Sequence, residues 1–201
     1  MNHKTGDNLE DKQLIDRVLC GDQRAFGMVI KNTEKLVAQI IFKLIPVAED
    51  RKDLAQDVYL KIFHKLGSFK FESKLSTWIA RIAYNTCLSW IEKKKPVYPG
   101  DMDEECFQAH PYVVENGIAD SSADTERLVT QKQLDLILRK EVANLPAMYQ
   151  LLITLYHQES MSYEELSQVT GLPQGTVKSY LFRARKTLKE NLLSMYKKEA
   201  L

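Results

Sequence analysis

The segment from residue 162 to 192 constrains the fold more than any other part of this 201-residue chain. Ser162 precedes Glu165 by three positions, the spacing at which a hydroxyl and a carboxylate cap the first amides of a helix. Gly171 then suits a left-handed turn, which glycine adopts without steric cost, and Pro173 suits the first turn of a following helix. The order of these residues predicts a short helix, a tight turn and a longer helix.

The second helix of this unit has two distinct faces. One face carries apolar residues three or four positions apart, and we expect it to be buried: Val177, Leu181, Ala184, Leu188 and Leu192. The opposite face carries Thr176, Ser179, Arg183 and Lys186. In DNA-binding helix-turn-helix units such a row contacts base edges at its N-terminal end and phosphates further along. The alternative is a helical hairpin with a solvated basic face. It does not explain why the helix cap, the glycine, the proline and the apolar stripe all stand at the positions that a helix-turn-helix requires.

Composition and charge bound the class of protein. With 44% hydrophobic and 27% charged residues, the chain is typical of soluble globular proteins and is long enough for two small domains. The net charge is only +1, yet residues 96–125 contain seven acidic residues and no lysine or arginine, so basic residues concentrate on either side of an acidic bridge. The sequence shows neither a signal peptide nor a run long enough to span a bilayer, and we therefore expect a cytoplasmic protein.

The spacing of the cysteines and the absence of catalytic motifs argue against disulfides, a zinc site and enzymatic activity. Cys20, Cys87 and Cys106 are odd in number and far apart, which favours neither a disulfide framework nor a zinc site. Two of them lie on apolar helical stretches, where we expect reduced core residues. The sequence contains no glycine-rich nucleotide loop, no metal-ligand cluster and no nucleophile beside a base, so we expect no enzymatic activity, no cofactor and no bound metal.

Apolar periodicity predicts helix over most of the chain outside the acidic bridge. The expected helices are 12–19, 23–44, 53–66, about 75–93, one opened by Pro146, and the helix-turn-helix. We therefore predict an all-α fold of two small helical domains, 10–95 and 126–196, joined by a flexible acidic linker, 96–125. The alternative for the linker is a segment that becomes ordered in a basic channel of a partner.

The helix expected at 75–93 carries a second group of interest. Its apolar face is predicted to consist of Leu75, Ile79, Ile82 and Trp90, which leaves Trp78, Arg81 and Asn85 together on a different face. An aromatic ring can stack on a base, an arginine can hold a phosphate, and an asparagine can pair with a base edge. The preceding loop adds Phe69, Lys70, Phe71 and Lys74. Core packing with a solvated rim is the alternative for this group.

Two runs of the sequence together resemble a known family. DLAQDVYLKIFHKLGSFKFESKLSTWIARIAYNTCLSWIEKKK, residues 53–95, and LPAMYQLLITLYHQESMSYEELSQVTGLPQGTVKSYLFRARKTLKENL, residues 145–192, resemble the extracytoplasmic-function (ECF) class of bacterial RNA polymerase sigma factors. The resemblance implies a protein that binds core RNA polymerase, directs it to promoters through their −10 and −35 elements and nucleates promoter opening. It also implies promoter DNA as a partner, single-stranded at −10 and double-stranded at −35, an anti-sigma factor, and a monomer when free.

The resemblance assigns roles to three groups of residues. Contacts with core polymerase are expected from Asp53, Gln56, Asp57 and Lys61. Contacts with the −10 element and strand separation are expected from Lys70, Phe71, Lys74, Ser76, Trp78, Arg81 and Asn85. Contacts with the −35 element are expected from Gln174, Thr176, Lys178, Ser179, Arg183 and Lys186. A solvated helix face is the alternative for the first group.

Two other functions stay open on the sequence alone. A conventional helix-turn-helix regulator, with an N-terminal domain that dimerises or senses a ligand, would bind an operator tightly without polymerase. A chain that acts chiefly as a docking partner for an inhibitor is the other possibility, and no residue in the sequence identifies that inhibitor.

Overall fold

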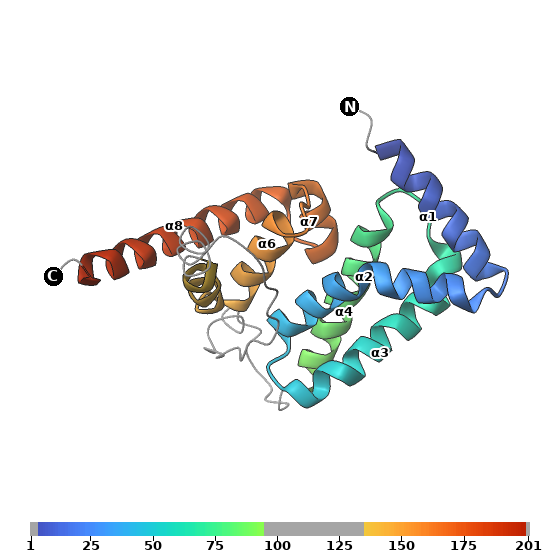
Figure 1. Ribbon diagram of the computed structural model, residues 1–201, viewed down its shortest axis with the longest axis horizontal. Coiled ribbons are helices and arrows are strands. Elements are labelled where there is room, and N and C mark those ends of the chain that lie inside the picture. The colour runs from blue at the N-terminus through green and yellow to red at the C-terminus, as the bar shows by residue number, and fades with distance from the viewer. Residues whose placement is uncertain (1–3, 95–134, 200–201) are drawn as a thin grey trace, which may run out of the picture.

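The computed structural model describes residues 4–94 and 135–199 (Figure 1). Every regular element within these two ranges is helical, which confirms the predicted all-α class. The N-terminal range contains α1 (Lys4–Leu19), α2 (Gln23–Leu44), α3 (Ala48–Lys65), the short 3-10 helix η1 (Leu66–Ser68) and α4 (Leu75–Lys94). The C-terminal range contains helical residues 135–143, α6 (Ala147–His157), α7 (Tyr163–Thr170) and α8 (Gln174–Glu199). The predicted acidic linker, 96–125, lies outside the described residues.

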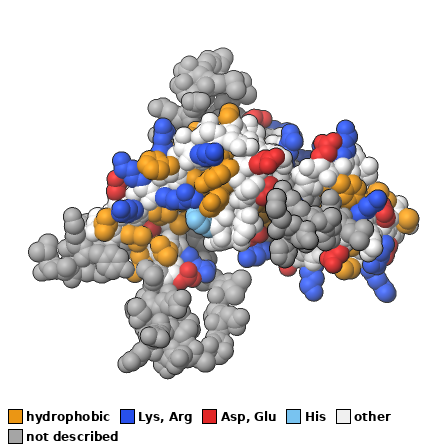
Figure 2. Space-filling view, turned by 90° about the horizontal axis from the view of Figure 1, so that it is seen from above, with side chains coloured by type: hydrophobic (Ala, Val, Ile, Leu, Met, Phe, Trp, Pro, Cys, Tyr) orange, Lys and Arg blue, Asp and Glu red, His pale blue; other side chains and the backbone are white. Residues whose placement is uncertain are grey.

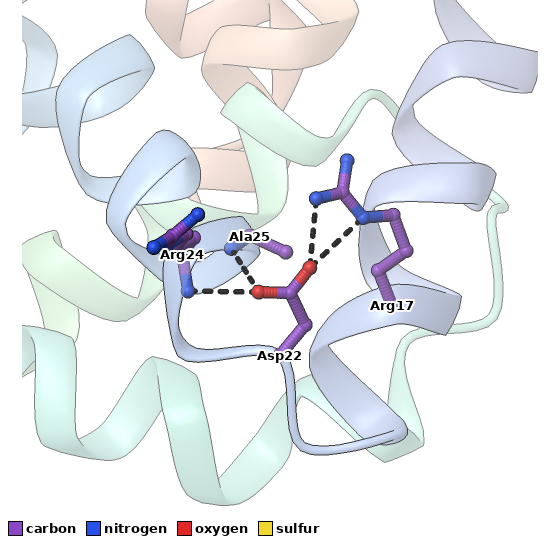
Figure 3. A network of polar contacts seen from close by, with 4 residues as sticks. All are labelled: Arg17, Asp22, Arg24 and Ala25. Atoms are coloured by element: carbon purple, nitrogen blue, oxygen red, sulfur yellow. Dashed lines mark hydrogen bonds and ion pairs between the residues drawn. The ribbon is translucent and has the colours of Figure 1, made fainter.

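Helix α2 has the predicted bounds because Asp22 caps its N-terminus. One carboxylate oxygen of Asp22 accepts hydrogen bonds from the amides of Arg24 at 2.9 Å and Ala25 at 3.2 Å (Figure 3). The other oxygen accepts a hydrogen bond from Nη2 of Arg17, near the end of α1, at 2.7 Å. The contact with Arg17, and then that with Ala25, lowers the pKa of Asp22. This one side chain therefore fixes both the start of α2 and its connection to α1.

Helix α3 begins at Ala48 rather than at the predicted Asp53. The additional turn contains Glu49 and Asp50, whose negative charges favour the positive N-terminal end of a helix. Periodicity missed this turn because it contributes no buried apolar residue to the stripe formed by Leu54, Val58 and Ile62.

Helix α4 is buried on more than one side, since α2, α3 and α7 all pack against it (Figure 1). The predicted apolar face was therefore too narrow. Leu75 and Ile79 are buried as expected and Ile82 and Trp90 are half-buried, but further residues of the helix are buried as well: Thr77, Ala80, Ala83, Tyr84, Thr86 and Cys87. A helix with several packed sides loses the single-stripe pattern on which the sequence prediction rested.

The two cysteines expected in the core differ in their surroundings. Cys87 is buried, and burial raises the pKa of its thiol to about 12, so it is an inert packing residue. Cys20 is exposed, and the prediction of a core position was wrong for it. Its position follows from the end of α1 at Leu19, after which the chain no longer follows the helical stripe. Cys106 lies outside the described residues.

The C-terminal part forms the predicted helix-turn-helix. The Ser162 hydroxyl accepts a hydrogen bond from the Glu165 amide at 3.2 Å, and the Glu165 carboxylate accepts one from the Ser162 amide at 2.7 Å, which completes a capping box. Gly171 has φ +74°, the left-handed conformation expected of it. Ser167 donates from its hydroxyl to the carbonyl of Leu172 at 2.6 Å, which closes the turn. The apolar stripe of α8 is fully buried at Val177, Leu181 and Ala184 and half-buried at Leu188 and Leu192.

The two helical parts pack against each other. Helix α6 packs on α2 and α7 packs on α4, as Figure 1 shows near the centre of the molecule. Buried apolar side chains of both parts belong to one continuous cluster. Helix α8 begins at this junction and extends away from it (Figure 1). Within the described ranges, no helix combines the length and the apolar character that crossing a bilayer requires.

Candidate functional site

The outer face of α8 gathers the residues predicted to read duplex DNA. Thr176 is half-buried, and the others are exposed: Gln174, Lys178, Ser179, Arg183 and Lys186. The Ser179 hydroxyl donates to the Gly175 carbonyl at 2.9 Å, so its orientation along the helix is fixed. The turn and the buried stripe hold this face away from the body, which gives it the geometry that a major-groove helix requires.

Phe182 is a feature of the same face that the sequence prediction missed. Its side chain is 68% exposed although it is large and apolar. It follows the buried Leu181 directly and therefore falls outside the stripe, on the exposed side next to Ser179, which precedes it by three positions. An apolar ring on a recognition face can contact the methyl group of thymine. The position was readable from the sequence as an aromatic residue out of register with the buried stripe.

A cluster of aromatic and basic side chains flanks this face. The rings of Tyr156 and Tyr163 are stacked, with centroids 5.2 Å apart. The guanidinium of Arg185 lies 5.0 Å from the centre of the Tyr156 ring, and the ammonium of Lys178 lies 5.6 Å from that of Tyr163. Figure 2 shows basic and hydrophobic side chains interleaved on this half of the molecule, to the left in the view from above.

The basic side chains of this flank create a positive potential, which favours negatively charged groups. Hydrogen bonds with Tyr156 and Arg185 lower the pKa of the Tyr163 hydroxyl, and nearby Lys178 adds to the effect. Burial and the charge of Arg185 lower the pKa of His157, so its imidazole is neutral near pH 7. Cations beside tyrosine hydroxyls are a common arrangement for contacts with phosphates. Only Lys178 of this cluster was predicted from the sequence.

In the N-terminal part, the aromatic residues before α4 pack against one another. Phe69 is buried, and its ring centroid lies 4.7 Å from that of Phe71 and 5.2 Å from that of Trp78. Phe71 has φ +58°, a conformation that is costly for a residue with a Cβ. Trp78 is half-buried beside Phe69, so part of its ring packs in the N-terminal part and part of it is exposed.

The polar residues predicted for the −10 element divide between two places. Arg81 and Asn85 are exposed one turn apart on α4, on the side that also carries Trp78. Lys70 is exposed in the loop. The half-buried Ser76 lines a surface hollow with residues of α1 and α2, and Lys74 reaches the junction with the helix-turn-helix. At that junction, Nζ of Lys74 forms an ion pair with Oε1 of Glu165 at 3.0 Å.

The outer side of α3 carries the residues predicted to contact polymerase. Their side chains are exposed, and Lys61 donates from Nζ to the Thr86 hydroxyl of α4 at 3.2 Å; the set is Asp53, Gln56, Asp57 and Lys61. Leu60 and Phe63, which the sequence prediction missed, are 58% and 51% exposed on the same helix. Both fall outside the buried stripe of Leu54, Val58 and Ile62. This position outside the stripe could have indicated from the sequence that the two side chains are exposed.

The described residues offer no group of three or more His, Cys, Asp or Glu side chains arranged to hold a metal ion. A shallow surface depression of about 430 Å³ lies along α8 between Arg185 and Leu193. The three candidate sites are thus faces of helices and one adjoining loop.

The chain is similar to known proteins over most of its length. A family model described as Sigma-70 region 2 matches residues 29–97, and one described as Sigma-70, region 4 matches residues 135–188. The ECF RNA polymerase sigma-E factor of Escherichia coli is 30% identical over 182 residues, which cover 90% of this chain and 94% of that protein. The RNA polymerase sigma-H factor of Pseudomonas aeruginosa is 29% identical over 183 residues, which cover 91% of this chain and 94% of that protein.

Two solved structures share the fold. One is CnrH in complex with the cytosolic domain of CnrY, with a TM-score of 0.56, 20% identity and coverage of 94% of this chain and 97% of that one. The other is RpoE of Bartonella quintana in complex with the anti-sigma factor NepR, with a TM-score of 0.57, 24% identity and coverage of 83% and 96%. The two matched regions, their order and the identity over nearly the whole length agree: this chain belongs to the ECF class of RNA polymerase sigma factors.

Proposed function

We propose that this sigma factor loads core RNA polymerase onto promoters by reading a −35 element with α8 and opening the DNA at a −10 element with α4 and its preceding loop. The observation that carries the proposal is the exposed polar face of α8, held in a helix-turn-helix that follows an N-terminal part matched by region 2. In this division, residues 10–95 serve polymerase docking and opening, 96–125 connect the parts, and 126–196 read the −35 element. Members of the family are initiation factors, and we infer that this chain performs no bond chemistry itself.

The −35 contacts follow from the geometry of α8. Thr176 and Ser179 lie near its N-terminal end, where a recognition helix meets base edges. Arg183 lies one turn further and can hold a guanine edge or a phosphate. The flanking Arg185 and Tyr163 lie beside this face, where the sugar-phosphate backbone would run. This part therefore reads duplex DNA without further rearrangement of the helix itself.

The −10 contacts require exposed groups beside an aromatic surface. Arg81 and Asn85 supply a phosphate contact and a base-edge contact, and the edge of the Phe69–Trp78 pair supplies a surface for a base. Stacking on an aromatic residue contributes about 1–3 kcal/mol per base, comparable with the few kcal/mol lost when a base leaves the helix. One or two captured bases are thus enough to shift local opening.

Docking on core polymerase is assigned to the outer side of α3. Leu60 and Phe63 are large exposed apolar residues, and acidic and amide groups of the same helix surround them. An apolar centre with a polar rim is the usual anatomy of a protein interface. Burial of each apolar side chain contributes roughly 1.5–3 kcal/mol. The prediction from sequence, which rested on Asp53, Gln56, Asp57 and Lys61, is thereby extended by two apolar residues.

An inhibitory partner is proposed from the neighbours. One of the structures sharing this fold is bound to the anti-sigma factor NepR. We expect this chain to be held by an inhibitor of the same kind when it is not bound to polymerase.

Run-off transcription with purified core polymerase tests the proposed function. A promoter is first selected from a DNA library by its binding to the complex of core polymerase and this chain. On that promoter, we expect a transcript only when this chain is added to the core polymerase. Arg183→Ala should reduce the transcript, and Arg139→Ala, an exposed arginine paired with Asp135 outside the proposed interfaces, should leave it unchanged. No transcript from any retained DNA, with tight DNA binding by the chain alone, would instead favour a stand-alone regulator.

A further inference from the structure

Gly175, in the first turn of α8, is a glycine that the fold itself does not require. Its backbone is helical, unlike that of Gly171, whose φ of +74° explains the glycine at that turn. A Cβ built on Gly175 would meet no atom within 4 Å outside its chain neighbours and its own helix backbone. Glycine destabilises a helix relative to alanine, because it loses more conformational freedom on folding. Stability alone therefore favours alanine at this position.

An open glycine does not by itself indicate a ligand. Gly27 of α2 is also exposed, and a Cβ built there would likewise meet no atom within 4 Å. Gly175 differs from Gly27 by its place in the proposed −35 surface. It lies one turn before Ser179 and two turns before Phe182, on the same exposed side of α8. A missing side chain at this place changes how closely DNA can approach the helix.

The side chains on this exposed side increase in size from the N-terminal to the C-terminal end of the row. Gly175 has none, and the Ser179 hydroxyl donates to the Gly175 carbonyl at 2.9 Å, which holds that short side chain against the helix. Further along α8, the exposed side chains are large or long: Phe182, Arg183 and Lys186. The helix backbone is therefore most accessible around Gly175, whereas the long side chains can span a wider gap at the other end.

The dimensions of the major groove make a single Cβ important. The groove is about 12 Å wide and an α-helix with its side chains is about 10–12 Å across, so the helix fits with little spare room. The longer neighbours of Gly175 do not stand in its way. Gln174 lies about 100° around the helix, at 3.6 residues per turn. Lys178 is directed to the flank, with its ammonium 5.6 Å from the centre of the Tyr163 ring.

From these observations we propose that Gly175 is the point of closest approach between α8 and the −35 element, with DNA occupying the space where a side chain would stand. This rests on the proposed function, because it concerns how the same surface meets duplex DNA. Close approach at Gly175 brings the short side chains of Thr176 and Ser179 within reach of base edges. Gly175 is thus a positioning residue, which sets the depth at which its neighbours enter the groove.

The substitution Gly175→Ala tests this, because stability and DNA binding should not fall together. The thermal midpoint of the full chain should stay unchanged or rise by up to about 4 °C, since alanine is the better helix former. Affinity for the −35 duplex should fall by at least about fivefold, the loss expected when a base contact of Thr176 or Ser179 is no longer reached. Circular dichroism gives the midpoint. Fluorescence anisotropy of a labelled −35 duplex, with the full chain assembled on core polymerase, gives the affinity.

Gly27→Ala is the matched control, since it adds the same methyl group at an exposed helical glycine outside the −35 surface. Its affinity for the −35 duplex should equal that of the unsubstituted chain. A second readout distinguishes positioning from a general loss of DNA binding. Binding to an unrelated duplex depends on phosphate contacts, so Gly175→Ala should weaken it much less than binding to the −35 duplex.

The outcomes separate this inference from the proposed function. Affinity of Gly175→Ala for the −35 duplex equal to that of the unsubstituted chain would overturn the close approach. A lowered thermal midpoint would also overturn it, because the fold itself would then require the glycine. If Arg183→Ala weakens binding to the same duplex and Gly175→Ala does not, reading of the −35 element by α8 stands without Gly175. If the unsubstituted chain with core polymerase does not distinguish the −35 duplex from an unrelated one, the proposed function fails.

Discussion

The two surfaces proposed to meet DNA are built differently. The face of α8 is open: its polar residues are exposed, and the contacts that shape it, a capping box, a left-handed glycine and a buried stripe, lie within about thirty residues of sequence. The −10 surface is only partly available, because Trp78 packs on Phe69 and Lys74 is paired with Glu165 of the other part. The difference indicates that duplex reading is preformed, whereas strand opening requires rearrangement. Recruitment and opening should therefore respond to different substitutions.

The largest effect is expected from Trp78→Ala, which removes both packing on Phe69 and a surface for a base. Loss of one stacked base costs about 1–3 kcal/mol, and the cavity beside Phe69 adds to it, so opening should slow by tenfold or more. Binding to a −35 duplex should change little. Stopped-flow fluorescence of a base analogue at −10 measures the rate, and thermal unfolding checks that the domain is folded. A Trp78→Phe variant as slow as Trp78→Ala would argue against a stacking role.

Arg183→Ala probes the preformed surface and should act on recruitment. Removal of one bidentate contact costs about 1–3 kcal/mol, which corresponds to a loss of about 5- to 150-fold in affinity for the −35 duplex. Once the holoenzyme is bound, opening should proceed at the rate of the unsubstituted protein. Fluorescence anisotropy on the duplex gives the affinity, with Arg139→Ala as the control. If Arg183→Ala and Trp78→Ala each slowed opening and weakened binding to the same extent, the proposed division between recruitment by α8 and opening by α4 would be contradicted.

A smaller effect is expected at the flank of α8. Arg185→Ala should weaken binding to all −35 duplexes by a similar factor, because a phosphate contact carries no sequence information. The slope of log affinity against log salt should become shallower by about one. Titrations at several salt concentrations measure this slope. Tyr163→Phe, which removes only the hydroxyl, should show a part of the change; a loss confined to one DNA sequence would mean that Arg185 reads bases.

The smallest effect concerns the pH dependence of stability through Glu165. Its pKa in the folded protein is lowered, so its charged form stabilises the fold at pH values above the ordinary value of 4.5, and this contribution is lost as the pH falls through the lowered pKa. The difference in free energy of unfolding between the unsubstituted chain and Glu165→Gln should therefore shrink on acidification below about 4.5. Urea unfolding at several pH values gives this difference. A gap that stays constant with pH would show that the carboxylate charge contributes nothing.

Local chemistry made much of the fold predictable. The Ser162–Glu165 spacing before α7 is a capping signal that depends on neighbours in sequence, and the structure reproduces it. Asp22 caps α2 by the same local chemistry. The burial of Val177, Leu181 and Ala184 follows from spacing alone in the same way. By contrast, the several packed sides of α4 result from contacts with α2, α3 and α7, which no local pattern contains.

The candidate sites were predictable to a similar extent. The polar row on α8 and the charged side of α3 were assigned from sequence, and the structure exposes the side chains of each, apart from the half-buried Thr176. Leu60, Phe63 and Phe182 were missed because apolar residues were considered only as core candidates, although their register outside the buried stripes marks them as exposed. The pairing of Lys74 with Glu165 joins residues far apart in the chain, so it required the tertiary structure.

Permanganate footprinting of promoter DNA tests the central claim most directly, because the reagent oxidises thymines that have left the double helix. The account predicts reactive thymines at the −10 element only when core polymerase and this chain are present together, and a marked loss of that reactivity with Trp78→Ala. Thymines that stay protected in a complex shown to contain promoter, core polymerase and this chain would contradict it.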